Sequence, residues 1–326
     1  MKAGRWVDVG RVVCAEVPRP SPSDGEILIR TAYTSICGSD LHSVYGGAPP
    51  PSVAAGHPGH ESVGEVVESR CPGFEPGDRV LTVPHFVDGR CMAEYQALPG
   101  AFCIRLTSRA PLSQLLMAQQ LGTVIYALRY RPLDLVGRDV AVIGQGSAGA
   151  FFTFLLKRAG AARVMVSDKS PARLAYSRQL GADLTVLAGP GDASEDDFRS
   201  VVLAATGGRG ADLVVEAVGS RETFPLSLEL AAARGTVLWF GLPEGTGDYP
   251  LSFAEFFRKF LTAYAISGTQ GEPGFGSFRY AVRLIDDGAI DVTPLLSHLL
   301  PIDEVEKAYQ IAHDRTDGAL KVSVSF

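Results

Sequence analysis

A short apolar run that leads into a glycine-rich turn constrains the fold of this chain most strongly. Residues 140–143 (Val-Ala-Val-Ile) precede glycines at positions 144, 146 and 149, and an apolar segment, 150–159, follows. A strand, a G-x-G-x-x-G turn and a helix in this order hold a dinucleotide pyrophosphate, because the glycines permit a tight turn, close approach of the backbone to the phosphates and close packing of helix on strand. The free N–H groups of the helix then face the anion. We expect the cofactor-binding residues of this turn to be Gly144, Gly146, Ser147, Ala148 and Gly149.

An acidic residue follows the next predicted strand. Residues 163–167 lead to Asp168, about twenty residues beyond the turn, where a carboxylate accepts hydrogen bonds from the adenosine ribose hydroxyls. A carboxylate there repels a 2′-phosphate, so Asp168 favours NAD over NADP, and the nearby cations Lys169 and Arg173 would soften that choice. We include Lys169 among the candidate cofactor contacts. The alternative is that Asp168 is a solvated loop acid or the N-cap of a helix that begins at Pro171.

The middle of the chain alternates between strand and helix patterns. Residues 112–131 are predicted to form a helix that stops at Pro132, and helical spacing recurs in residues 171–180 and 222–233. The predicted strands are residues 140–143, 164–167, 184–187, 213–216, 237–240 and 263–267. Strands that alternate with helices in this way indicate a six-stranded doubly wound parallel sheet.

The two ends of the chain have a different pattern. Short β-type runs at 11–17, 26–33, 62–68, 79–83 and 91–98 are separated by Gly, Pro and Asp, which predicts a barrel-like β domain. After Gly268, two helices (275–287 and 302–312) and a last strand (320–326) are expected, and we expect this tail to return to the first domain because the parallel sheet is already complete. The predicted domains are residues 1–120 with 269–326, and residues 121–268.

Composition excludes several classes of protein. At 326 residues the chain exceeds the usual size of one compact core, which supports two domains. A net charge of -6 gives no electrostatic reason to expect nucleic acid or an anionic membrane as a partner. The start of the chain has no apolar signal region, and five scattered cysteines argue for reduced thiols. We expect a cytoplasmic protein.

A second group of reactive side chains lies in the predicted β domain. The stretches Cys37-Gly-Ser-Asp-Leu-His42 and Gly59-His60-Glu61 place a thiolate, an imidazole and a carboxylate on what we interpret as two loops. This donor set suits zinc, and a catalytic zinc keeps one coordination position open for a substrate oxygen. Such a zinc would act as a Lewis acid on a bound hydroxyl. His57 is the main rival of His60 as a ligand.

In these motifs the chain resembles the zinc-dependent medium-chain dehydrogenase/reductase family, which includes alcohol, sorbitol, threonine and glucose dehydrogenases. The resemblance covers nearly the whole chain and rests on the two stretches above, the glycine fingerprint and three shorter motifs. These three are Gly77-Asp-Arg-Val80, Ala93-Glu-Tyr95 and Leu180-Gly-Ala182. It implies a GroES-like β-barrel catalytic domain beside a Rossmann nucleotide-binding domain, and a homodimer or homotetramer.

The same resemblance implies roles for individual residues. Cys37 and His60 would bind catalytic zinc, and Glu61 would be an inner-sphere or second-sphere ligand. Ser39 and His42 would relay the substrate proton to solvent. Main chain near Val218, Phe240 and Leu242, which follow predicted strands, would hold the nicotinamide ring.

Two departures from the family pattern bear on the metal. The third protein ligand is usually Cys, Asp or Glu, but the matching position here is Gln119, whose neutral amide oxygen is a weaker zinc ligand. The glucose dehydrogenase branch resembles this arrangement. In addition, only residues 83–91, with the single Cys91, stand where many relatives carry a four-cysteine zinc lobe. We expect one catalytic zinc per chain and no structural zinc.

The leading hypothesis is an NAD-dependent, zinc-assisted dehydrogenase that oxidises a secondary alcohol on a polyol, sugar or cyclitol, or reduces the ketone. One alternative is a metal-free reductase of the same fold that acts on a C=C, C=N or carbonyl group in specialised metabolism, with Cys37 and His60 inherited but unused. An alternative from another class is a non-catalytic NAD-binding sensor or assembly subunit.

Overall fold

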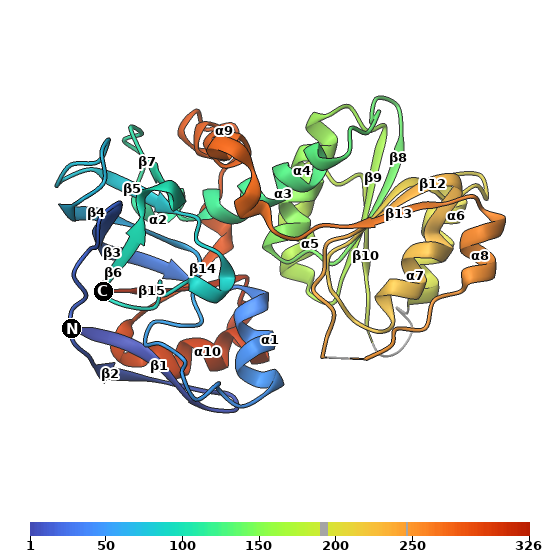
Figure 1. Ribbon diagram of the computed structural model, residues 1–326. Coiled ribbons are helices and arrows are strands. Elements are labelled where there is room, and N and C mark those ends of the chain that lie inside the picture. Colours follow the sequence, from blue (N-terminus) through green and yellow to red (C-terminus); the bar gives the residue numbers. More distant parts are fainter. Residues whose placement is uncertain (190–194, 246) are drawn as a thin grey trace. The chain divides into compact units, whose positions relative to one another are not determined.

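The computed structural model describes residues 1–189, 195–245 and 247–326 of the chain. These residues form two compact units (Figure 1). Unit 1 comprises Met1–Thr123 and Gly268–Phe326, and unit 2 comprises Val124–Ser267. The two ends of the chain thus fold together, and the central segment forms the other unit.

Unit 1 contains a seven-stranded sheet and a two-stranded hairpin. Its strands are β1 (Lys2–Asp8), β2 (Arg11–Glu16), β3 (Glu26–Ser35), β4 (Ser62–Ser69), β5 (Arg79–Thr82), β6 (Tyr95–Pro99), β7 (Cys103–Arg105), β14 (Leu296–Pro301) and β15 (Lys321–Ser325). Its helices are α1 (Gly38–Gly46), α2 (Leu112–Leu115), α9 (Gly276–Asp286), α10 (Val305–Asp314) and the start of α3 (Met117–Tyr130). The large sheet has the order β14-β15-β3-β4-β5-β7, with β6 also paired to β3. The last strand in sequence, β15, is therefore an inner strand.

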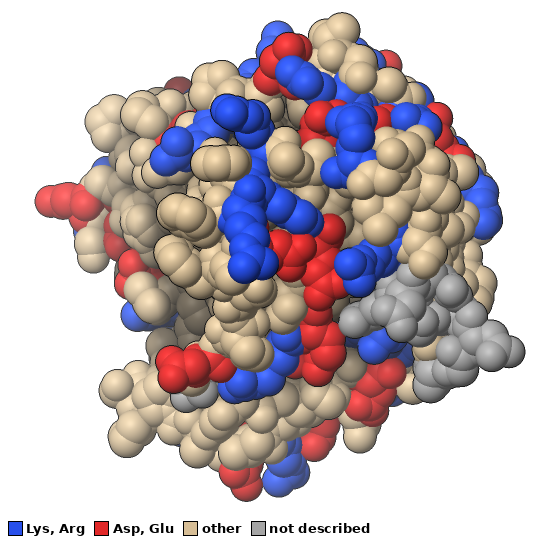
Figure 2. All heavy atoms as spheres, turned by 90° about the vertical axis from the view of Figure 1, so that its right-hand side faces the viewer, with Lys and Arg blue, Asp and Glu red and all other residues tan. Residues whose placement is uncertain are grey.

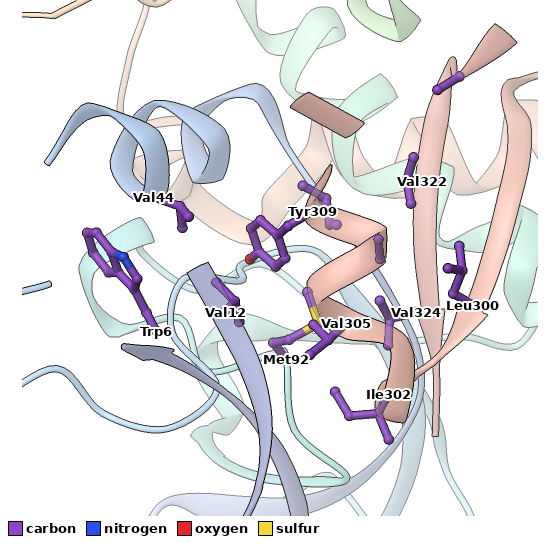
Figure 3. Close-up of a cluster of buried hydrophobic side chains, with 13 residues drawn as sticks. Trp6, Val12, Val44, Met92, Leu300, Ile302, Val305, Tyr309, Val322 and Val324 are labelled. Carbon is purple, nitrogen blue, oxygen red and sulfur yellow. The ribbon is translucent and has the colours of Figure 1, made fainter. Parts of the chain in front are cut away.

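An apolar cluster around α10 forms part of the core of unit 1. Figure 3 shows Val305 and Tyr309 of α10 between Val322 and Val324 of β15 on one side and Val12 and Val44 on the other. Tyr309 is fully buried, and its hydroxyl donates to the carbonyl oxygen of Pro58 at 2.9 Å. The tail of the chain therefore packs under the segment that leads to His60.

Unit 2 is a parallel sheet covered by helices on both faces (Figure 1). Its strands are β8 (Asp139–Ile143), β9 (Arg163–Asp168), β10 (Leu184–Leu187), β11 (Ala211–Glu216), β12 (Ala231–Trp239) and β13 (Thr262–Ala265). Its helices are α4 (Ser147–Arg158), α5 (Pro171–Gln179), α6 (Glu195–Ala205), α7 (Thr223–Leu230) and α8 (Phe253–Arg258). The strand order is β10-β9-β8-β11-β12-β13, which confirms the predicted doubly wound sheet. The chain adds β9 and β10 on one side of β8 and then β11, β12 and β13 on the other side, so the strand order reverses between β8 and β11. Ligands of such sheets bind at this reversal, beyond the carboxyl ends of the strands.

Some predicted elements differ from the structure. Residues 37–42, interpreted as a loop, form the N-cap and first turns of α1, because the carboxylate of Asp40 accepts a hydrogen bond from the N–H group of Cys37 at 2.9 Å. Residues 112–131 form two helices, α2 and α3, rather than one. The predicted helix 222–233 ends at Leu230, because Ala231 already pairs with Ala211 as the start of β12. Pairing in the sheet overrides the helix propensity of alanine there.

The predicted strand 91–98 is shorter than expected. It begins only at Tyr95, because the N–H groups of Cys91 and Met92 bond to Gly59 and Gly56 instead of to a neighbouring strand. Strands β1, β7 and β14 were not predicted, and β7 has only three residues, too few to show an alternating pattern.

The surface carries charges of both signs. On the face drawn in Figure 2, basic and acidic side chains are interspersed among neutral ones, so this face has no broad basic surface. Within the described ranges, every helix is too short or too polar to cross a lipid bilayer.

Candidate metal and nucleotide sites

Three predicted metal ligands come together in unit 1. Potential ligand atoms of Cys37, His60 and Glu61 all lie within 4.8 Å of one another. Zinc binds sulfur at about 2.3 Å and nitrogen or oxygen at about 2.0–2.2 Å, so two ligands of one ion lie at most about 4.5 Å apart, and this group is close to that size. Cys37 is the N-cap residue of α1 and is partly buried. The donor set and its dimensions fit a zinc ion.

The position of His60 is fixed by a buried carboxylate. His60 is 7% exposed, and its Nδ1 lies 3.1 Å from Oδ1 of Asp40, which is fully buried. Burial alone lowers the pKa of His60, but Asp40 and Cys37 outweigh it and raise the pKa well above its usual value. The surroundings of His60 therefore favour a positive charge, which a proton or a metal ion supplies. With Nδ1 held by Asp40, Nε2 is the nitrogen left for a metal.

Glu61 belongs to a buried ion pair. Its Oε2 lies 2.7 Å from Nζ of Lys321 in β15, and the hydroxyl of Ser35 donates to the same oxygen. Glu61 is 2% exposed and Lys321 is 3% exposed. Burial opposes charge on both groups, yet their attraction lowers the pKa of Glu61 and raises the pKa of Lys321. Glu61 is thus an anion whose Oε2 is already engaged.

The other predicted residues of unit 1 occupy distinct places. Ser39 and His42 are three residues apart on α1 and therefore share a face of the helix, and Nδ1 of His42 lies 2.8 Å from the carbonyl oxygen of Gly38. Gln119 is buried in α3 at 2% exposure. His57, the rival ligand, has its Nδ1 3.2 Å from the carbonyl oxygen of Gly89 and is absent from the ligand group of the described residues. Its role stays a prediction, as do those of Ser39, His42 and Gln119.

The segment 83–91, which the sequence places where many relatives carry a zinc lobe, contributes one aromatic ring beside the candidate ligands. Phe86, in the short helix Phe86–Asp88, lies with its ring centroid 5.3 Å from that of His60 and 5.5 Å from that of His57. Cys91 is buried, and its thiol donates to Oε1 of Gln96 at 3.2 Å. Phe86 therefore gives the candidate metal group an apolar neighbour.

In unit 2 the glycine turn has little room for side chains. Gly144 has φ +88°, which glycine adopts without strain. A Cβ on Gly149 would lie 1.9 Å from the carbonyl oxygen of Gly144, so α4 approaches the turn too closely for any other residue. A Cβ on Gly146 would meet only Nη1 of Arg173, at 4.0 Å. Gly146 thus faces open space at the N-terminus of α4, where Ser147 and Ala148 begin the helix, and a phosphate fits that place.

Asp168 ends β9 and contacts the glycine turn. Its Oδ2 accepts a hydrogen bond from the N–H group of Gln145 at 2.6 Å, and its Oδ1 accepts one from the N–H group of Ser170 at 2.8 Å. Nη1 of Arg173 lies 3.7 Å from Oδ2, whereas Lys169 is exposed. Arg173 therefore lies close enough to offset part of the negative charge of Asp168.

Two turns follow β11 and β12 at the same edge of the sheet. Val218 lies just after β11, and Phe240 and Leu242 lie just after β12. A Cβ on Gly219 would lie 2.0 Å from the carbonyl oxygen of Leu242, so the two turns touch. The buried Glu216 holds the first turn, because its Oε1 accepts hydrogen bonds from the N–H groups of Val218 and Gly219 at 2.9 and 2.8 Å.

Comparisons with known families agree with both units. Residues 23–110 match the family described as alcohol dehydrogenase GroES-like domain, and residues 148–287 match zinc-binding dehydrogenase. The chain belongs to the zinc-dependent medium-chain dehydrogenase family. The predicted family, fold class and enzyme class, an oxidoreductase, are thereby confirmed.

Members of the medium-chain dehydrogenase family are similar to this chain over nearly its full length. An L-threonine 3-dehydrogenase of Bacillus velezensis is 28% identical over 91% of this chain and 90% of its own. An alcohol dehydrogenase of Cupriavidus necator is 27% identical over 99% of this chain and 98% of its own. The structure of alcohol dehydrogenase TADH from Thermus sp. ATN1 superposes with a TM-score of 0.84 at 26% identity and covers 100% of this chain and 99% of its own.

Sequence reasoning on this dehydrogenase missed several supporting residues. Asp40 lies inside a recognised motif, and its spacing of three from Cys37 is the signal of a helix N-terminus. Lys321 and Ser35 lie outside every motif of the sequence analysis, so no sequence signal indicated their contact with Glu61. Gln145 was treated as a spacer, but its Oε1 accepts hydrogen bonds from Thr153 at 2.9 Å and Ser177 at 2.7 Å.

Proposed function

We propose that the chain is an NAD-dependent, zinc-assisted dehydrogenase that oxidises a secondary alcohol of a polyol, sugar or cyclitol to a ketone, or catalyses the reverse reduction. The observation that carries the proposal is the convergence of Cys37, His60 and Glu61 in unit 1. Unit 1 would be the catalytic domain and unit 2 the nucleotide-binding domain. A cytoplasmic location and a homodimer or homotetramer belong to the same prediction.

The residues of unit 1 would bind the metal and move the substrate proton. Cys37 and His60 would hold one zinc ion, with Gln119 as a further ligand, and bound zinc supplies Lewis-acid polarisation of the substrate hydroxyl. Asp40 keeps His60 in one orientation through the contact at Nδ1. Glu61, held by Lys321, would balance the charge of the ion from the second sphere. Ser39 and His42, on one face of α1, would accept the hydroxyl proton and pass it to solvent.

Unit 2 would bind NAD at the reversal of strand order. The N–H groups around Gly146 and Ser147 would hold the pyrophosphate, and Asp168 would accept hydrogen bonds from the adenosine ribose. Main chain near Val218, Phe240 and Leu242 would fix the nicotinamide, which accepts the hydride when NAD is bound. Because Arg173 lies 3.7 Å from Asp168, we propose a preference for NAD rather than exclusion of NADP.

A variant series with metal analysis tests this function. Cys37→Ala should lose bound zinc and NAD-coupled oxidation across a panel of polyols, sugars and amino-cyclitols, while NADH still binds. Cys14→Ala removes a thiol outside the metal group and should keep both properties. His60→Ala should behave as Cys37→Ala does, whereas His57→Ala should retain zinc.

Three results would contradict the proposal. Turnover that survives in zinc-free Cys37→Ala would favour the metal-free reductase. Wild-type protein that holds two tightly bound zinc ions per chain would contradict the single-zinc prediction. A lack of NADH binding in wild-type protein would reject the nucleotide site independently of the metal.

A further inference from the structure

One cavity of unit 1 lies outside the candidate metal group. Its volume is about 400 Å³, and three segments line it: β1 with the residues that follow β2, residues 53–55, and residues 90–97. None of the predicted metal ligands lines it. The proposed zinc site therefore does not account for this cavity.

Main-chain hydrogen bonds join the three segments that line this cavity. The N–H group of Gly4 donates to Met92 at 2.8 Å, that of Gly56 donates to Gly4 at 2.8 Å, and that of Met92 donates to Gly56 at 3.1 Å. Arg5 follows Gly4 directly, and Arg90 lies two residues before Met92. The backbone thus brings these two arginines to one cavity.

The charges around the cavity are unbalanced. Arg5 and Arg90 both line it, both are exposed, and within the described residues neither guanidinium has a hydrogen bond or an ion pair. A third guanidinium, that of Arg19, lies 4.1 Å from the ring centroid of Tyr95, which also lines the cavity. No Asp or Glu is among the described lining residues. The lining therefore offers the two guanidinium groups of Arg5 and Arg90 to an anion.

The remaining walls are mostly apolar and select the kind of anion. Val17, Pro18, Val53, Ala54 and Ala93 contribute aliphatic surface. Inorganic phosphate would gain nothing from such walls, whereas a carboxylate with a short aliphatic chain would use them and the arginines together. A guanidinium also matches a carboxylate with two parallel hydrogen bonds.

We propose that this cavity binds a small aliphatic carboxylate, with the carboxylate on Arg5 and Arg90 and the alkyl chain against Val53 and Ala54. The site lies close in sequence to the predicted zinc ligand, because residues 53–56 lead to His60 and the N–H group of Cys91 bonds to Gly59 at 3.0 Å. Binding itself depends on neither zinc nor NAD, so it is tested separately from the proposed enzyme activity.

Calorimetric titration with hexanoate tests the site. Wild-type protein should bind one equivalent with a dissociation constant of about 0.1–1 mM, the range expected for a few kcal/mol of polar and apolar contact. Cys37→Ala should bind hexanoate equally well, which excludes binding to a zinc ion. Arg5→Gln and Arg90→Gln should each weaken binding by about tenfold, which corresponds to the loss of one charge-assisted hydrogen bond.

The control is Arg109→Gln, which removes an exposed arginine of unit 1 that does not line the cavity. It should bind hexanoate as the wild type does, and thermal unfolding should show that all arginine variants remain folded. The proposal is wrong if wild-type protein shows no saturable binding, if Arg5→Gln and Arg90→Gln retain full affinity, or if inorganic phosphate binds as tightly as hexanoate.

Discussion

Replacement of Lys321 by Met tests the buried ion pair beside the candidate metal group. Nζ of Lys321 lies 2.7 Å from Oε2 of Glu61, and both side chains are almost completely buried. In Lys321→Met the carboxylate keeps the hydroxyl of Ser35 but loses its counter-charge. Removal of one partner from a buried pair costs about 3–5 kcal/mol, because the remaining charge stays desolvated. We expect the free energy of unfolding of unit 1 to fall by that amount.

The two tryptophans of the chain allow unit 1 to be followed alone. Trp6 lies in the core of unit 1, and Trp239 lies in β12 of unit 2. In a Trp239→Phe background, urea unfolding monitored by fluorescence reports on Trp6, which avoids the assumption that both units unfold together. A zinc chelator in excess ensures that metal binding does not compensate for the lost lysine.

Two further variants separate the ion pair from simple loss of packing. Lys307→Met removes an exposed lysine that pairs with Glu304 at 3.1 Å and should cost no more than about 1 kcal/mol. The double variant Lys321→Met/Glu61→Gln removes both charges of the pair and should regain most of the loss. A cost for Lys321→Met as small as that of Lys307→Met, or no recovery in the double variant, would refute this reasoning.

Three other substitutions have expected outcomes. Tyr309→Phe leaves the carbonyl oxygen of Pro58 without its donor and should lower the unfolding free energy of unit 1 by about 1–3 kcal/mol in the same urea assay. Burial raises the pKa of Glu216 above 4.5 despite its hydrogen bonds, so its ionised form is penalised in the folded state. That penalty is absent below pH 4.5, the pKa of an ordinary glutamate, and it grows as pH rises through the folded pKa. The unfolding free energy of Glu216→Gln relative to wild type should therefore increase from acid to neutral pH, and a pH-independent difference would contradict this. Arg173→Ala removes the cation beside Asp168, so the ratio of kcat/KM with NADP to kcat/KM with NAD should fall roughly fivefold, the factor for about 1 kcal/mol. An unchanged ratio would contradict this prediction.

The geometry of the glycine turn could be predicted from the sequence because its determinants are local. The roles predicted for Gly144 and Gly149 concern a single turn and the helix that follows it. The positive φ of Gly144, and the 1.9 Å that would separate a Cβ on Gly149 from the carbonyl oxygen of Gly144, are geometric consequences of that turn. Alternation of strands and helices was enough to predict the parallel sheet. The boundaries that failed, such as the end of α7 at Leu230, depend on which strand lies alongside, and local propensity carries no such information.

Only the side chains of the candidate metal group could be predicted from the sequence, because the groups that contact them come from distant segments. Lys321, Ser323 and Ser325 alternate with Val322 and Val324, a pattern that predicts a polar, solvated face of the last strand. In the structure Lys321 and Ser323 are each 3% exposed, so that polar face is covered there, and Lys321 can remain buried only because Glu61 lies opposite. The bond from Tyr309 to Pro58 likewise joins residues 251 positions apart. A motif specifies which side chains can bind a metal, whereas the charge balance around them is decided by strand order.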